Sequence, residues 1–234
     1  MLCFARALAL CPLLPALVSL APGHAADKGA REETLRYSIN WPSGLSLGEA
    51  ILSRQNLDSG GLEMHFRIDA GIPGFQVVDR FTARSTASFC SQEFEKHIEH
   101  GKRKSAERSI FDPATNTVRR QTIGGGTSEL PAEPCARDAL TFLHFVRQEL
   151  SQGRLPPETR VFFGAPYTVR FAYAATQIVT VGEQRLEADV LNVIVKGKVA
   201  DHTFQMYFAR EPARTPVLVK LPLSMGLFSM ELVR

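Results

Sequence analysis

The sequence predicts a mainly β protein, a strongly curved antiparallel sheet or open barrel of about ten strands with one α-helix packed in its concavity. Two observations support this fold class. Apolar and polar residues alternate along most of the chain, and clusters of turn-forming residues separate the alternating runs. Period-two alternation is typical of antiparallel strands with one buried and one solvated face. With 234 residues, 44% of them hydrophobic, the chain can bury a substantial core.

The predicted strands follow one another at the spacing expected of a sandwich or barrel. The clearest alternating runs cover residues 35–41, 62–68, 167–173, 204–208 and 228–232. Gly, Pro, Asn, Asp and Ser gather between such runs, at residues 41–44, 58–61, 71–74, 112–116 and 124–126. Neither an internal repeat nor a long linker interrupts the pattern. We therefore expect a single β-rich domain over residues 26–234.

One segment, residues 136–150, has the periodicity of a helix. Its main apolar side chains share one face, and they are Ala139, Phe142, Leu143, Val146 and Leu150. Asp138 falls at the first turn, and Gly153 follows the last. A helix with such a wide apolar face has to be buried, most simply against the concave side of the sheet.

The first 25 residues have the layout of a secretory signal peptide. Arg6 comes first, an apolar run over residues 7–20 follows, and small residues precede the expected cleavage site. Cleavage is expected after Ala25, with cleavage after Ala26 as the neighbouring option. The bulky leucine before Cys11 argues against anchoring as a lipoprotein at that cysteine. We therefore expect an exported protein, located in the periplasm.

Removal of this segment changes the charge and the cysteine count. The formal net charge falls from +3 to +2, because Arg6 is the only charged residue removed, and this argues against a nucleic-acid partner. No later stretch is apolar over the length of a membrane-spanning helix. Two cysteines remain, Cys90 and Cys135, and an oxidising compartment favours a disulfide between them. The alternative is a reactive thiol with His97 or His144 as its base.

Short motifs occur in order along the whole mature chain. They are Leu35-Arg36-Tyr37-Ser38-Ile39, residues 44–50, Val78-Asp79-Arg80, Phe111-Asp112, residues 138–143 with Val146-Arg147, Leu150 and Gly153, Thr215-Pro216-Val217, and residues 225–232. This ordered set resembles a bacterial exported family catalogued as domain of unknown function 3108. The chain departs from the family pattern at residues 211–214, which affects only a loop.

The resemblance implies an envelope protein of unknown biochemical activity. Its strand-rich layout around one helix is also similar to that of the carriers that shuttle lipoproteins across the periplasm. In those carriers, an open and strongly curved sheet holds acyl chains. Fold alone does not give function, so this second likeness provides only an expectation.

Candidate catalytic and metal-binding residues each have a simpler structural interpretation. Ser46 lies in a G-x-S-x-G sequence, but the residues after it read as a strand, whereas a hydrolase nucleophile is followed by a helix. Five potential metal ligands lie close together in the sequence: Glu93, Glu95, His97, Glu99 and His100. As a strand, the segment would place the four at odd positions on one wet face, whereas a helix would place His97 and His100 on one face. We expect no catalytic residue, no metal and no cofactor.

Two charged features remain. A basic patch around residues 102–104 is either a solvated hairpin or a contact for anionic lipid headgroups. Asp79 alternates with Val77 and Phe81, so either Asp79 or Val78 faces the interior. A carboxylate among apolar residues needs a partner, and Arg147 on the predicted helix is a candidate. We therefore expect a structural ion pair between Asp79 and Arg147.

The function hypothesis rests on whether aromatic residues line a cavity. We expect the lining to be drawn from Phe81, Phe142, Phe145, Tyr167, Phe171, Tyr173, Phe204, Phe208 and Phe228. The leading hypothesis is a non-enzymatic protein that binds or carries a hydrophobic or lipidic ligand, such as lipid or lipoprotein acyl chains. The alternatives are a structural or assembly factor of the envelope with a filled core and, with less support, a serine hydrolase that uses Ser46. The sequence does not specify an oligomeric state.

Overall fold

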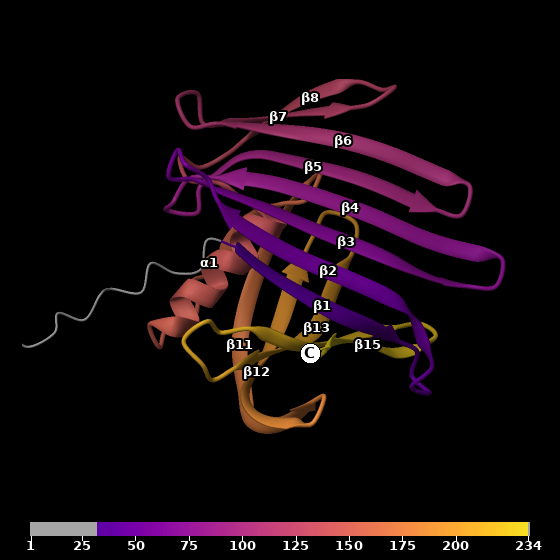
Figure 1. Cartoon of the computed structure of the whole chain (residues 1–234). Helices are drawn as coiled ribbons and strands as arrows, with labels where there is room; N and C mark the ends of the chain where they lie inside the picture. The colour runs from indigo at the N-terminus through magenta and orange to yellow at the C-terminus, as the bar shows by residue number, and fades with distance from the viewer. Residues whose placement is uncertain (1–31, 234) are drawn as a thin grey trace, which may run out of the picture. The chain divides into compact units, whose positions relative to one another are not determined.

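The computed structural model describes residues 32–233, so the predicted signal peptide lies outside the described residues. These residues form fifteen strands and one helix (Figure 1). The first eight strands are β1 (Glu32–Asn40), β2 (Ser46–Asn56), β3 (Leu62–Ile72), β4 (Phe75–Ser85), β5 (Ser91–His100), β6 (Arg103–Asp112), β7 (Thr117–Thr122) and β8 (Thr127–Pro131). The remaining elements are β9 (Arg137–Asp138), α1 (Ala139–Ser151), β10 (Thr159–Phe162), β11 (Pro166–Val181), β12 (Gln184–Lys196), β13 (Asp201–Ala209), β14 (Pro216–Leu223) and β15 (Gly226–Val233).

All fifteen strands belong to one sheet, in the order β8-β7-β6-β5-β4-β3-β2-β1-β15-β14-β13-β12-β11-β10-β9. Almost every strand pairs with its neighbour in sequence through an antiparallel hairpin. Two pairings differ. The first and last strands, β1 and β15, pair antiparallel and so join an N-terminal half, β1–β8, to a C-terminal half, β9–β15. The short β9 pairs parallel to β10 at one edge.

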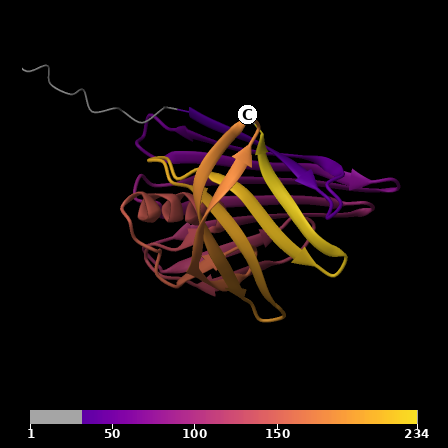
Figure 2. The same ribbon diagram turned by 90° about the horizontal axis from the view of Figure 1, so that it is seen from below.

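The two halves of the sheet face each other, and α1 lies on the concave side between them (Figures 1 and 2). The mainly β fold class, the curved open sheet and the helix in its concavity are therefore confirmed. The number of strands is higher than the ten or so predicted. Strands such as β6 carry charged residues on both faces in places, and this obscures the period-two pattern by which strands are recognised.

The helix begins three residues later than predicted and ends one residue later. Arg137 and Asp138 are extended and pair with β10, so the helix starts at Ala139. The Asp138 side chain then caps it, accepting hydrogen bonds from the backbone N–H groups of Leu140 (2.8 Å) and Thr141 (3.0 Å). Among the described residues, no helix has the length and apolarity needed to cross a membrane.

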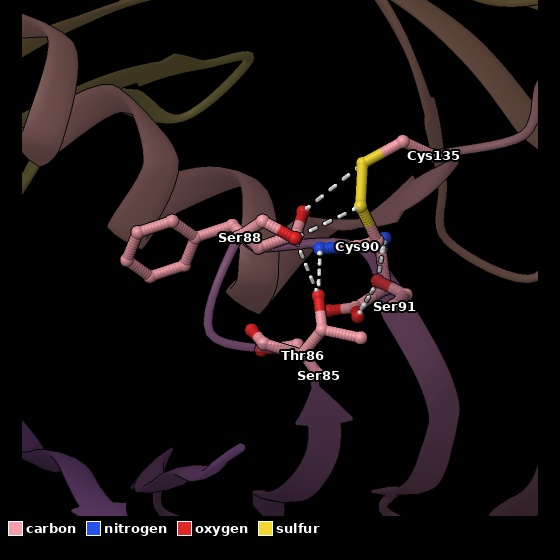
Figure 3. Close-up of a disulfide and its surroundings, with 8 residues drawn as sticks. Ser85, Thr86, Ser88, Cys90, Ser91 and Cys135 are labelled. Carbon is pink, nitrogen blue, oxygen red and sulfur yellow. Dashed lines mark hydrogen bonds between the residues drawn. A yellow bond between two sulfur atoms is a disulfide. The ribbon is translucent and has the colours of Figure 1, made fainter. Parts of the chain in front are cut away.

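A second junction ties the halves together at the start of α1. Cys90, just before β5, and Cys135, just before β9, form the predicted disulfide, with their Cα atoms 4.7 Å apart (Figure 3). The backbone N–H of Ser91 donates to the carbonyl of Ala136 (3.0 Å), and the Asp138 N–H donates to the Ser91 hydroxyl (2.8 Å). At the end of the sheet that holds α1, the disulfide and these hydrogen bonds thus join the N-terminal half to the C-terminal half.

Candidate functional site

A cavity of about 590 Å³ lies between α1 and the two halves of the sheet. Pockets that bind small molecules typically have volumes of about 300–1,000 Å³, so this cavity has the size of a ligand site. Its walls are apolar, apart from one carboxylate and two tyrosines. The helix supplies the inner end of the cavity through Ala139, Leu140, Phe142 and Leu143.

The wall from the C-terminal half is built by strict alternation along four adjacent strands. Every second side chain points inward, which places Tyr167, Val169 and Phe171 of β11, Val193 and Val195 of β12, Phe204 and Met206 of β13, and Val219 and Leu221 of β14 on the cavity. The opposite wall comes mainly from Leu52, Phe66, Ile68, Asp79 and Phe81. The alternation recognised in the sequence therefore produces a continuous apolar surface.

The cavity opens toward the hairpin turns that lie farthest from α1. On β12 and β13, the deeper lining residues Val193 and Met206 are buried, whereas Val195 and Phe204, nearer the turn, are half-buried. On β14, the lining residue nearest the turn, Leu221, is 36% exposed. Burial therefore decreases along each strand in the same direction, and this gradient locates the mouth.

The structure places five of the nine aromatic residues predicted to line a cavity on the cavity wall: Phe81, Phe142, Tyr167, Phe171 and Phe204. The other four, which are predictions that the structure contradicts, do not line it. Phe145 stacks under the Arg137 guanidinium, and Phe208 is buried in the core. Phe228 packs against Trp41, and Tyr173 is largely exposed. Alternation identifies which residues share a face, but the curvature of the sheet decides which of them reach the hollow part.

Asp79 is the one charged group on the cavity wall. It faces inward with Phe81, so of the two alternatives that the sequence left open, Asp79 and not Val78 faces the interior. Its side chain is only 11% exposed, and its two carboxylate oxygens lie 3.0 and 3.1 Å from Nε2 of His100, at the end of the adjacent strand β5. His100 is more exposed than Asp79, so the pair joins the cavity wall to solvent.

The predicted ion pair between Asp79 and Arg147 is wrong. Arg147 instead donates two hydrogen bonds to the carboxylate of Glu33 on β1, both 2.7 Å long, and a third to the carbonyl of Ala213 (3.0 Å). Arg147 does not line the cavity, because it lies a turn farther along α1 than the lining residue Leu143 and is held there by Glu33 and Ala213. The true partner of Asp79 follows from the register of β4 and β5. This register places His100 opposite Val77, which lies on the same inward face of β4 as Asp79.

The side of α1 that faces Glu33 holds a cluster of buried ionisable groups. His144 is almost fully buried, with Nδ1 lying 3.4 Å from Nη1 of Arg147. Burial holds the pKa of His144 well below its usual value, and the positive charges of Arg147 and Arg54 lower it further. Burial raises the pKa of Glu33, but the hydrogen bonds and charge of Arg147 outweigh this and lower it overall. These groups fasten α1 to β1 and do not line the cavity.

The other sequence candidates lie elsewhere. Ser46 begins β2, where its Oγ lies 3.4 Å from the Oγ of Ser38, and a strand follows it. The cluster in β5 splits between two faces of the strand: Glu93 and Glu95 bind Arg108 on the outer face, while His100 faces inward toward Asp79. The described residues contain no group of three His, Cys, Asp or Glu side chains placed to hold a metal ion.

Comparison with known proteins agrees with this architecture. The family model described as "Protein of unknown function (DUF3108)" matches residues 36–233. The chain belongs to the DUF3108 family. No curated protein matches the chain. Among solved structures, this DUF3108 protein is similar to a β-barrel-like protein of domain of unknown function DUF1849 from Brucella abortus, with a TM-score of 0.64. The match covers 86% of this chain and 95% of that one at 10% identity, so it shows a shared fold alone.

Proposed function

We propose that this DUF3108 protein is a non-enzymatic, exported envelope protein that binds a lipidic ligand in its cavity. The observation that carries the proposal is the apolar cavity itself, which opens at one end and is closed by α1 at the other. The disulfide supports an oxidising compartment such as the periplasm. A hollow space between helix and sheet argues against the alternative of an assembly factor with a filled core.

The position of Asp79 gives the proposed ligand an orientation. Asp79 lies on β4 between the deeper Phe81 and the turn at Phe75, on the mouth side of the cavity. An amphiphile would therefore place its tail against α1 and its headgroup near Asp79 and His100. Because a carboxylate accepts hydrogen bonds, the favoured headgroup is a neutral or cationic donor, such as a hydroxyl or an amine.

The energetics favour a long chain over a short one. Burial of each CH₂ group contributes about 0.8 kcal/mol, so a tail of about twelve groups gains on the order of 10 kcal/mol. Association costs about 4–15 kcal/mol of lost freedom, so tails of only a few carbons do not offset it. We therefore expect a ligand with a medium or long acyl chain, for which monoacylglycerols are suitable probes.

The proposal is tested by filling the cavity. Val195→Phe adds volume to the wall near the mouth, while Ile194→Phe makes the same addition on the opposite face of β12, because Ile194 is not on the cavity wall. We expect native mass spectrometry of the protein purified from its own envelope to show bound lipid in the wild type and in Ile194→Phe. The Val195→Phe protein, checked for folding by thermal unfolding, should have lost that lipid. Lipid-free wild-type protein that also fails to bind monoacylglycerol in calorimetric titration would contradict the proposal.

A further inference from the structure

Large apolar side chains are exposed at one end of the sheet, on the hairpin turns that surround the mouth of the cavity. They come from four turns: Leu45 between β1 and β2, Ile72 and Phe75 between β3 and β4, Val199 between β12 and β13, and Leu223, Met225 and Leu227 between β14 and β15. We call these residues the rim. Their exposure ranges from 45% at Ile72 to 100% at Val199.

The antiparallel topology explains why these turns share an end. Consecutive hairpin turns alternate between the two ends of a sheet, so every second turn lies on the same side. Contacts bring neighbouring turns together. A Cβ on Gly226 would lie 2.6 Å from Cγ of Pro42, and one on Gly101 would lie 3.3 Å from the ring of Phe75. The turns before β2 and β15 are therefore in contact, as are those before β4 and β6.

The opposite end of the sheet provides an internal comparison. Its hairpin turns, residues 57–61, 113–116, 182–183 and 210–215, contain no exposed large apolar side chain. Outside these turns, Leu155, in the segment after α1, and Val233, at the end of β15, are exposed large apolar residues near that end. Exposure of large apolar residues is costly for a soluble surface, so their concentration on one set of turns indicates a contact that covers them.

Charge on the turns indicates what that contact is. Within the rim turns and the adjacent β5–β6 turn, the charged residues are Lys102 and Lys198; Arg103 and Lys104 follow the first of these turns, and Asp201 follows the second. Only Lys104 of these four cations forms an ion pair among the described residues, with Glu99 at 2.8 Å. The turns of the opposite end carry Asp58, Glu183 and Glu211 together with two arginines, Arg210 and Arg214, whose charges are paired with Asp189. Apolar tips combined with solvent-exposed cations match the surface of an anionic membrane, where side chains enter the headgroup layer and cations bind phosphates.

The rim is also continuous with the cavity. Leu221 lines the cavity, is partly exposed, and lies two residues before the rim residue Leu223 on the same strand. A membrane in contact with Leu223 would therefore face the mouth directly. A ligand could then pass between the bilayer and the cavity without crossing water, which is a further reason for apolar side chains at this place.

We propose that the rim docks the protein onto a membrane surface that contains anionic lipid, with the mouth of the cavity facing the bilayer. The idea that a lipid passes through the mouth depends on the proposed function, whereas the docking of the rim onto a membrane does not. If a second copy of the chain or a protein partner covers the rim instead, the protein will not bind lipid vesicles. That outcome would overturn the inference.

Flotation with vesicles tests the proposal. We expect residues 26–234 to float with vesicles of phosphatidylglycerol and phosphatidylcholine, more weakly with phosphatidylcholine alone, and less as salt is raised. The variant Leu223→Ser/Met225→Ser should lose most of this binding. Its matched control, Tyr173→Ser/Ile178→Ser, removes two equally exposed apolar residues from β11, outside the rim, and should bind like the wild type.

A second pair of variants separates the charge contribution. Lys102→Gln should weaken binding to anionic vesicles about fivefold, the usual effect of one cation near such a surface. Arg185→Gln, next to the turn between β11 and β12 at the other end, should leave it unchanged. Equal flotation of the rim variant and its control would overturn the proposal.

The docking proposal and the proposed function can fail separately. Val195→Phe should abolish binding of monoacylglycerol but not flotation, whereas the rim variant should keep the binding of monoacylglycerol below its micellar concentration. Flotation without any bound lipid would contradict the proposed function and leave docking in place. Lipid binding without flotation would contradict docking alone.

Discussion

Asp79 shows how one buried charge can define the polar end of an otherwise apolar site. A carboxylate in such a place is stable only with a partner, and His100 supplies it while remaining partly open to solvent. Because Asp79 lies on the cavity wall on the mouth side, its remaining hydrogen-bonding capacity is available to the headgroup of the proposed ligand. Arg147 and Glu33, in contrast, satisfy each other through two parallel hydrogen bonds and serve to hold the helix.

The first prediction at this scale concerns Asp79. Replacement Asp79→Asn keeps the size of the side chain and removes the charge, so it should weaken the binding of a long-chain amine on the order of tenfold or more. Binding of a fatty acid of equal length should improve, because a like charge is removed. Calorimetric titration of both probes measures the difference. Asp69→Asn, which lies on β3 and pairs with Arg67 outside the cavity, is the control and should change neither.

The second prediction concerns His144 and pH. Its pKa is lowered in the folded protein, so in acid the unfolded chain binds a proton at this residue that the folded chain does not. Stability should therefore fall as pH drops below about 6.5, by up to about 1.4 kcal/mol per pH unit. Urea unfolding of the wild type and His144→Gln at several pH values isolates this contribution as the difference between the two curves. Parallel curves would show that His144 is protonated equally in both states.

At the scale of elements, α1 depends on contacts that a helix-propensity argument does not include. Its cap, Asp138, is fully buried and hydrogen-bonded to Ser91 on β5 and to Thr141 on the helix itself. The disulfide lies next to this group of contacts, so the start of the helix, β5 and β9 form one junction. We infer that the junction fixes the position of α1 as the inner wall of the cavity.

The third prediction follows from that junction. The disulfide closes a segment with a sequence separation of 45 residues, for which loss of the bond should cost about 4 kcal/mol by restoring freedom to the unfolded chain. Urea unfolding of the double variant Cys90→Ser/Cys135→Ser, compared with oxidised wild type, measures this cost. Wild type with reductant serves as the control and should behave like the variant. An unchanged midpoint would show that the neighbouring hydrogen bonds alone hold the junction.

The elements also show what the sequence could and could not predict. The helix was recognisable because Phe142, Val146 and Leu150 repeat on one face, and the disulfide because only two cysteines follow the predicted signal peptide. The partner of Asp79 was not recognisable, since it depends on strand register that is set by the turns between β4 and β5. The cavity was not recognisable either, because alternation gives the same pattern for a wall that faces a hollow and for one that faces packed side chains.

At the scale of the whole described sheet, the two ends have different properties. One end holds α1, the disulfide and polar turns, and it is closed. The other end holds the mouth, the rim and the cationic turns, and it is open. This polarity connects the two proposals, because a ligand site that opens among exposed apolar side chains is suited to exchange with a lipid surface.

The pairing of β1 with β15 also has a consequence for how the chain folds. Each of the other antiparallel ladders joins strands that follow one another in sequence, so each half of the sheet can form from local hairpins, which are fast to close. The β1–β15 ladder joins Arg36 to Val233, across nearly the whole described chain, and such distant pairings form slowly. The two halves are therefore expected to fold early as separate meanders and to associate late. Until the final strand pairs, the cavity has only one complete wall, so the proposed ligand is expected to bind only after the last step of folding.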